Sequence, residues 1–282
     1  MIFYKNDIKK FFYIKEQSTK ITNDSKIDFK KQILDKSNKD LLNFINVPKK
    51  NNNIPDDTIY NDVISRQTKP FGDEAGRHIN VHETAHGIHS DLRNEYERIL
   101  GYKCNVFYCL KGRAVIIKDP PITISEVCGY IPKNLRSYRY DLYFKEQLKY
   151  WDDVPTYIFD EWTAYILGSE CAIEDYELGI AHTKSDAVSG CLDFSIYSIA
   201  FARAVKEEDS EYWNRHPEFK EFVKYNLKRA EMAFNKGKNI FKSEKQIRLL
   251  DSFINNPDSK ELKKFMIEEF GEYFINININ EN

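Results

Sequence analysis

Residues 82–86 are His82-Glu83-Thr84-Ala85-His86, and the spacing of this pentapeptide has a direct structural meaning. On an α-helix, residues four positions apart lie one turn apart on the same face. The imidazoles of His82 and His86 can therefore reach one metal ion together. Glu83 lies about 100° around the helix from His82. This places its carboxylate beside the open coordination position, where it can take a proton from a metal-bound water. The pentapeptide predicts a zinc ion, a hydrolytic reaction and a general base.

The surrounding sequence predicts one amphipathic helix from about 74 to 100. Its apolar residues follow steps of three and four, which gives a stripe that a core can bury: Val81, Ala85, Ile88, Leu92, Tyr96 and Ile99. Four of the six histidines form a second stripe beside it: His78, His82, His86 and His89. Asp73 is the predicted N-cap and Gly101 the predicted C-terminal stop. We expect the apolar stripe to face a core and the histidines to face a cleft.

This segment resembles the active-site helix of the zincin metallopeptidases. The resemblance implies that His82 and His86 bind zinc and that Glu83 is the general base. The metzincin pattern would place glycine at position 89 and histidine at position 92, and the chain has His89 and Leu92 there. His89 lies about 10.5 Å along the helix axis from His82, which is too far for both to bind one ion. Clostridial neurotoxin light chains have a similar H-E-x-x-H-x-x-H arrangement, in which the last histidine is not a ligand.

A catalytic zinc usually has three protein ligands and one water. In the gluzincin pattern the third ligand is a glutamate on a later helix, which here implies Glu161. Pro155 suits the first turn of that helix, Asp152 or Asp153 could cap it, and Gly168 lies near its expected end. A carboxylate in so apolar a helix needs a partner, because burying an unpaired charge is costly. The reserve candidates for the third ligand are Glu170, Asp160 and Glu126, in that order.

Hydrolysis of an amide creates a negatively charged oxygen that a Tyr, His or Arg donor usually helps to stabilise. Tyr157 and Tyr165 lie four residues on either side of Glu161 and share its helical face, so we predict them as catalytic residues. Other candidates are His182 and a basic and aromatic cluster of Arg136, Tyr138, Arg139 and Tyr140. Ligand histidines usually donate their second N–H to a carboxylate or carbonyl. Asp160 and Asp193 are candidates for that acceptor, and a helix cap or surface ion pair is the alternative for each.

Two apolar runs, 105–110 and 114–117, flank Lys111-Gly112-Arg113 and predict a β-hairpin. In zincins, an edge strand near the active-site helix binds extended substrate by backbone pairing. Here the hairpin follows the helix, whereas the usual zincin sheet precedes it. The resemblance therefore does not indicate which strand would hold substrate.

Composition limits the classes to which the chain can belong. Its 282 residues include 42 Lys and Arg and 44 Asp and Glu, so the net charge of −2 gives no overall field toward nucleic acid. No apolar run suits a signal peptide or a membrane span. The five cysteines are odd in number and lack C-x-x-C spacing, which favours reduced packing residues. We expect a cytoplasmic protein, or a secreted one without a recognisable signal peptide.

The sequence predicts a mainly helical α+β protein with a small β-sheet, organised around a zincin-like domain. Further helices are expected near 138–150 and 186–206, and amphipathic helices within 218–236 and 243–274. The predicted regions are a polar N-terminal segment (1–60), a catalytic region (61–205), a helical C-terminal region (206–274) and a disordered tail (275–282).

These features predict a zinc-dependent endopeptidase that acts on a peptide or protein substrate, with no nucleic acid partner. Zinc would be bound by His82, His86 and Glu161. Two alternatives remain: a zinc-stabilised binding or scaffold protein in which His78 or His89 closes the fourth position, and a zinc amidase acting on a non-protein amide such as peptidoglycan. The substrate and the oligomeric state are left open by the sequence.

Overall fold

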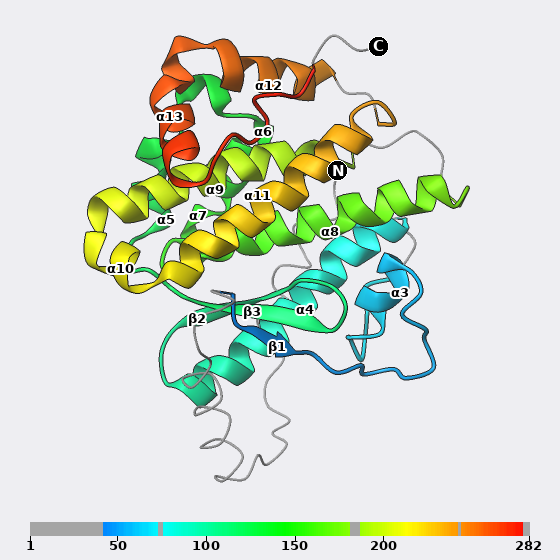
Figure 1. Cartoon of the computed structure of the whole chain (residues 1–282). Helices are drawn as coiled ribbons and strands as arrows, with labels where there is room; N and C mark the ends of the chain where they lie inside the picture. Colours follow the sequence, from blue (N-terminus) through cyan, green and yellow to red (C-terminus); the bar gives the residue numbers. More distant parts are fainter. Residues whose placement is uncertain (1–41, 73–75, 181–186, 242–243, 279–282) are drawn as a thin grey trace.

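The computed structural model describes residues 42–72, 76–180, 187–241 and 244–278. These residues form a mainly helical protein with one three-stranded antiparallel sheet, which confirms the predicted mainly helical α+β class (Figure 1). The sheet has the order β1-β3-β2, where the strands are β1 (Phe44–Asn46), β2 (Cys104–Tyr108) and β3 (Arg113–Lys118). All five residues of β2 are buried. The edge strand with an exposed residue is therefore β1.

The predicted hairpin is confirmed as β2 and β3, which pair from Cys104↔Lys118 to Tyr108↔Ala114. Strand β1 was not predicted, because it lies in the segment 1–60 that was expected to be a polar lead-in. The hairpin turn contains two non-glycine residues with positive φ, Leu110 (67°) and Lys111 (54°). A buried carboxylate supports this turn, since Asp62 accepts hydrogen bonds from the Lys111 amide (2.8 Å) and from the Tyr108 hydroxyl (2.9 Å).

The helix with the histidine stripe is α4 (Arg77–Leu100), preceded by the short helix α3 (Ile59–Ile64). Its predicted stop is confirmed, because Gly101 has the left-handed φ of 76° that favours glycine at a helix end. The structure places Gly76 at the N-cap, and the predicted cap Asp73 lies outside the described residues. The apolar stripe is buried at Val81, Ala85, Ile88 and Tyr96 and only partly buried at Leu92 and Ile99.

The expected end of the second helix near Gly168 was wrong, because α8 runs from Tyr157 to Glu177. Gly168 lies within α8 where this helix packs against α4: a Cβ at this position would be 2.9 Å from the His78 carbonyl oxygen. The glycine therefore allows a close helix approach and does not end the helix. The predicted caps were also wrong: Thr156 precedes α8, and Asp152 accepts hydrogen bonds from the Ser125 amide and hydroxyl.

Most of the remaining helices lie on the far side of α8 from the sheet (Figure 1). One of them also packs directly on the sheet, where its Phe222 stacks on Phe107 with ring centroids 4.8 Å apart. The predicted helix near 138–150 is broken into α6 (Tyr138–Asp141), a π-helical turn η4 (Leu142–Glu146) and α7 (Leu148–Trp151). The others are α5 (Ile124–Val127), η2 (Cys128–Tyr130), η3 (Lys133–Leu135), α9 (Ser189–Glu208), α10 (Ser210–Arg215), α11 (Pro217–Gly237), α12 (Glu244–Asn255), η5 (Pro257–Ser259) and α13 (Lys260–Glu269). The predicted 243–274 helical region is divided at Pro257.

Two groups of buried apolar side chains hold these elements together. The smaller group lies between α4, the sheet and α8, and the larger one joins α8 to α9, α11 and the C-terminal helices. The larger group takes residues from both sides of the boundary predicted at 205/206, and α9 crosses that boundary. In the predicted tail, Ile277 is only 8% exposed and belongs to the larger group.

Candidate metal centre

Three side chains from α4 and α8 converge on one point. His82 Nε2 and His86 Nε2 are 3.1 Å apart, and Glu161 Oε2 lies 3.7 Å from the first and 3.6 Å from the second. A circle through three points at these separations has a radius of about 2.0 Å, which lies within the usual zinc–nitrogen and zinc–oxygen distances of about 2.0–2.2 Å. The three atoms therefore form a group that could hold a metal ion.

The two helices position this group in different ways. His82 and His86 lie one turn apart on α4, and both side chains are partly exposed. Glu161 lies in the second turn of α8 and is only 4% exposed. Glu83 follows His82 on α4 and is half-buried. The two histidines are therefore accessible to solvent, whereas Glu161 is buried.

The two carboxylate oxygens of Glu161 have different surroundings. Oε1 accepts a hydrogen bond from the Tyr157 hydroxyl at 2.5 Å. Oε2 is buried and has no hydrogen-bond partner among the described residues. A buried carboxylate oxygen without a partner is costly, and a cation beside the two imidazoles would remove that cost. The surroundings of Glu161 thus fit a metal ligand.

Asp160 connects the histidine pair to the core. Its Oδ1 lies 2.8 Å from His86 Nδ1 and 2.6 Å from His89 Nδ1. These are hydrogen-bond distances, so both nitrogens donate to the carboxylate. A proton on His86 Nδ1 leaves the lone pair on Nε2, the atom that faces Glu161. Asp160 was one of the two residues predicted from the sequence for this role, and it orients His86. The same carboxylate also accepts a hydrogen bond from His89.

The same three residues, His86, His89 and Asp160, are also close enough to form a second group of possible ligands. His89 is 1% exposed and packs edge-on against Phe107, with ring centroids 5.7 Å apart. One imidazole would have to bind two ions through both nitrogens if both groups were filled. The short contacts to Asp160 instead favour hydrogen bonds in this second group.

The charges in the cluster are strongly coupled. Burial, followed by the neighbouring His86, lowers the pKa of His82 to about 3. Burial also acts to lower the pKa of His86, but Asp160 and Glu161 outweigh it and raise that pKa well above its ordinary value. Burial raises the pKa of Glu161, and the two histidines outweigh it and lower that pKa. Two carboxylates therefore favour one positive charge between them, which a divalent cation can supply in place of a proton.

Both predicted tyrosines lie at the cluster, with different partners. Tyr157 is hydrogen-bonded to Glu161, as described above. Tyr165 packs edge-on against the His82 ring, with centroids 4.4 Å apart. Burial raises the pKa of Tyr165, so its phenol stays protonated and can act as a donor. Gly190 makes room for this ring, because a Cβ there would be 2.0 Å from Tyr165 Cδ1.

The other sequence candidates lie elsewhere. Glu170 forms an ion pair with Arg229 (2.6 Å), and Glu126 caps α5 with Thr123, so neither reserve ligand reaches the cluster. Asp193 accepts from Arg139 at 3.2 Å and does not orient a ligand histidine. In the basic and aromatic cluster, Tyr138 is 55% exposed, Arg136 donates to the Ile131 and Cys128 carbonyls, and Tyr140 stacks on Phe144. His182 lies outside the described residues.

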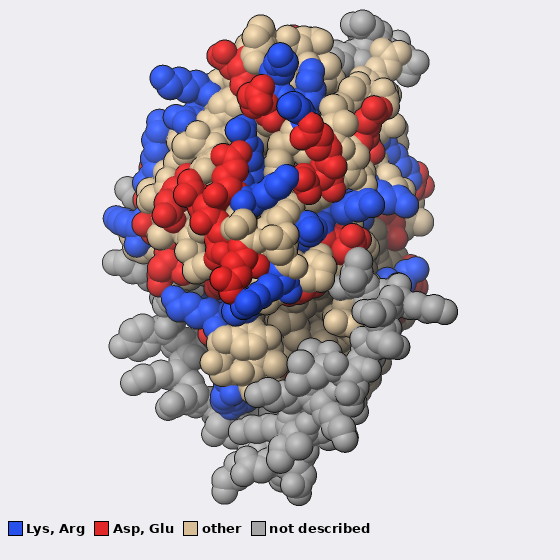
Figure 2. Space-filling view, turned by 60° about the vertical axis from the view of Figure 1, so that its left-hand side comes forward, with Lys and Arg blue, Asp and Glu red and all other residues tan. Residues whose placement is uncertain are grey.

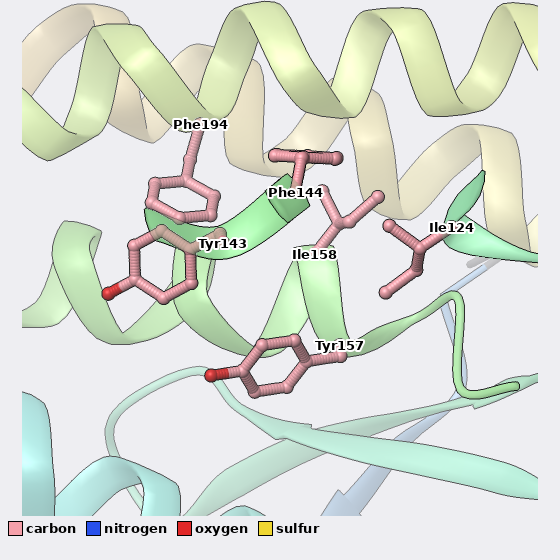
Figure 3. Close-up of a pocket in the computed structure, with 6 residues that line it drawn as sticks. All are labelled: Ile124, Tyr143, Phe144, Tyr157, Ile158 and Phe194. Atoms are coloured by element: carbon pink, nitrogen blue, oxygen red, sulfur yellow. The ribbon is translucent and has the colours of Figure 1, made fainter. Parts of the chain in front are cut away.

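Tyr143 was not predicted as a site residue, although it lies beside the cluster. Its hydroxyl is 3.3 Å from the Tyr165 hydroxyl. Tyr143 and Tyr157 line a small apolar pocket with Ile124, Phe144, Ile158 and Phe194, and their hydroxyls point to the same side of it (Figure 3). Tyr143 lies in the π-helical turn, and such turns often occur at functional sites. Helical periodicity gives no signal for a π-turn, so the sequence could not indicate this residue.

The surface and the comparisons add little to this geometry. The face in Figure 2 carries basic and acidic side chains side by side, without a large area of one sign among the described residues. No helix in the described part of the chain is long and apolar enough to cross a membrane. Comparisons with protein-family models, curated proteins and solved structures gave no match.

Proposed function

We propose that this protein is a zinc-dependent endopeptidase of the gluzincin type. His82, His86 and Glu161 would bind the zinc, and Glu83 would be the general base. The observation that carries the proposal is the triangle of His82 Nε2, His86 Nε2 and Glu161 Oε2, whose dimensions suit one zinc ion. The ligand pair and the base come from one helical pentapeptide, and the third ligand comes from α8.

Zinc in such a site lowers the pKa of a water and polarises the carbonyl that the water attacks. Glu83 would take the proton from the attacking water and pass it to the leaving amine. Asp160 would hold His86 in the tautomer that presents Nε2, and Tyr157 would fix the carboxylate of Glu161. Because Tyr157 is committed to Glu161, Tyr165 is the tyrosine available to donate to the carbonyl oxygen as it gains negative charge.

A purely structural zinc site is the competing function. Structural sites usually close the fourth position with a protein ligand. Among the described residues the cluster has three ligands, and His89 is turned toward Asp160. This arrangement supports an open fourth position, as hydrolysis requires. Hydrolysis of a non-protein amide would use the same residues, so a substrate screen must include peptidoglycan fragments beside peptides.

The first test is metal content, measured by elemental analysis on the wild type and on His82→Ala and Glu161→Ala. Glu177→Gln is the matched control, because Glu177 lies exposed on the same helix as Glu161. We expect one zinc per chain in the wild type and control, and loss of zinc in the two ligand variants. A wild type that takes up no zinc after reloading would remove the basis of the proposal.

The second test separates a catalytic site from a structural one. Glu83→Gln should retain zinc and lose turnover of an unstructured protein such as casein by about 10²–10⁴-fold, the usual contribution of a general base. Glu95→Gln, a half-buried glutamate on the same helix, is the control and should keep full activity. Full activity in Glu83→Gln would exclude the proposed base. A zinc-loaded wild type that hydrolyses neither casein nor peptidoglycan fragments would favour the structural site.

A further inference from the structure

Three tyrosines surround Glu161, and their hydrogen bonds give them unequal roles. The Tyr157 hydroxyl is used by the Glu161 carboxylate. The Tyr143 and Tyr165 hydroxyls lie 3.3 Å apart and share one hydrogen bond. A pair of phenols that shares one hydrogen bond keeps a second proton for another acceptor. Of the two phenols, Tyr165 is the one whose ring packs against His82 in the metal cluster.

Arg139 lies beside the Tyr165 ring. Its side chain is only 5% exposed, and its guanidinium carbon lies 4.9 Å from the centre of the Tyr165 ring. The guanidinium also interacts with the Tyr165 hydroxyl. Arginine has donors only, so the Tyr165 oxygen must act as the acceptor in that contact. The Tyr143–Tyr165 contact suits either hydroxyl as the donor; with Tyr143 donating, the Tyr165 oxygen accepts twice and its own proton is left for a third group.

The guanidinium is fixed from its other side. It donates to Asp193 Oδ2 (3.2 Å) and to Ser189 Oγ (2.8 Å), both on α9. The Tyr165 ring is likewise fixed, between His82 on one face and Phe194, whose ring stacks at 5.1 Å. Little freedom remains in either side chain. A donor held in place before the reaction has no reorganisation cost when charge develops beside it.

We infer that Arg139 is a positioning residue that, together with Tyr143, orients the Tyr165 hydroxyl toward the oxygen of a substrate carbonyl at the metal site. This inference rests on the proposed function, because it needs a metal at His82, His86 and Glu161. It assigns the donor to Tyr165 and gives a role to the buried Arg139–Asp193 pair, which is not part of the group of candidate metal ligands. The expected consequence is selective: loss of Arg139 geometry weakens binding of an oxygen ligand at the metal and leaves metal affinity intact.

The experiment uses the full chain loaded with cobalt(II), whose visible spectrum reports the metal, and acetohydroxamate as a small oxygen ligand. Four proteins are compared: the wild type, Tyr165→Phe, Arg139→Lys and the control Tyr176→Phe, which changes an exposed tyrosine on the same helix as Tyr165. Lysine keeps the charge that Asp193 needs and loses the planar fork. We expect cobalt affinity within threefold of the wild type in all variants. Acetohydroxamate affinity should fall at least tenfold in Tyr165→Phe and Arg139→Lys and stay unchanged in the control.

Each other outcome has a defined meaning. A wild type that binds no cobalt would refute the proposed function itself. Unchanged acetohydroxamate affinity in Arg139→Lys, or an equal loss of cobalt, would overturn the positioning role. If Arg139→Lys fails to fold, Tyr143→Phe replaces it, because this variant removes one donor to Tyr165 without altering the ion pair. A severalfold loss of acetohydroxamate affinity would then support the inference, and no loss would overturn it.

Discussion

Gly168 offers the sharpest test of how the two helices place the candidate metal ligands. In Gly168→Ala the new Cβ would lie 2.9 Å from the His78 carbonyl oxygen and 3.5 Å from His82 Cβ. Ordinary contact begins at 3.4 Å, so α4 and α8 must separate by about 0.5 Å. The His78 carbonyl cannot retreat alone, because within α4 it accepts the amide proton of His82. The shift is therefore transmitted to a ligand.

The magnitude follows from the precision that the site needs. Functional groups must be held within about 0.5 Å of their working geometry, and the expected shift equals that tolerance. We expect a 10–100-fold loss of zinc affinity, comparable to the loss of an outer contact and equal to about 1.4–2.7 kcal/mol. Overpacking should cost about 1–3 kcal/mol of folding free energy, offset by about 0.5–1 kcal/mol from the better helix propensity of alanine.

Zinc affinity is measured by competition with a chromophoric chelator, and stability by thermal unfolding of the metal-free protein. The two contributions leave a net loss of up to about 2.5 kcal/mol, which should lower the unfolding midpoint by up to roughly 10 °C in a chain of this size. The matched control is Gly129→Ala, because an added Cβ there meets nothing within 4 Å. If Gly168→Ala binds zinc as tightly as the wild type and unfolds at the same temperature, the close approach at Gly168 does not position the ligands.

Two further predictions concern the metal. Asp160→Asn should weaken zinc binding by about 10–100-fold while keeping one zinc per chain at saturation, because it reduces the basicity and orientation of His86; isothermal titration measures this, and wild-type affinity would show that Asp160 has no such role. Removal of zinc with a chelator should lower the unfolding midpoint, since an ion at 100 times its dissociation constant stabilises the folded chain by about 2.7 kcal/mol; equal midpoints with and without zinc, in calorimetry, would contradict binding at this cluster.

The sequence predicted those parts of the fold that depend on residues close together along the chain. The stripe of α4, its glycine stop and the β2–β3 hairpin follow from periodicity and turn chemistry, and all three are present. Strand β1 has three residues and exists through its pairing with β3, which is distant in sequence. The predicted helix end at Gly168 was wrong for a similar reason. The sequence alone does not distinguish a glycine at a helix crossing from a glycine at a helix end, because the partner helix is distant in the chain.

The same distinction between local and long-range contacts applies to the candidate site. The chain brings Glu161 to His82 and His86, as the gluzincin resemblance implied. The sequence left Asp160 and Asp193 as equal candidates to orient a ligand, and only the packing of α8 on α4 distinguishes them: Asp160 contacts His86, whereas Asp193 contacts Arg139. Tyr143 was missed because its position depends on a π-helical turn that no periodicity marks.

The division of the ligands between α4 and α8 also sets the order of events during folding. The two histidines become neighbours as soon as α4 forms, whereas Glu161 is 75 residues further along the chain than His86. A nascent chain that ends before α8 would offer the proposed zinc only the imidazoles of α4, which other histidine-rich peptides can match. Tight capture at the proposed site would have to wait until α8 has been synthesised and docked. The rate at which the chain takes up metal during refolding would thus time the docking of α8 on α4.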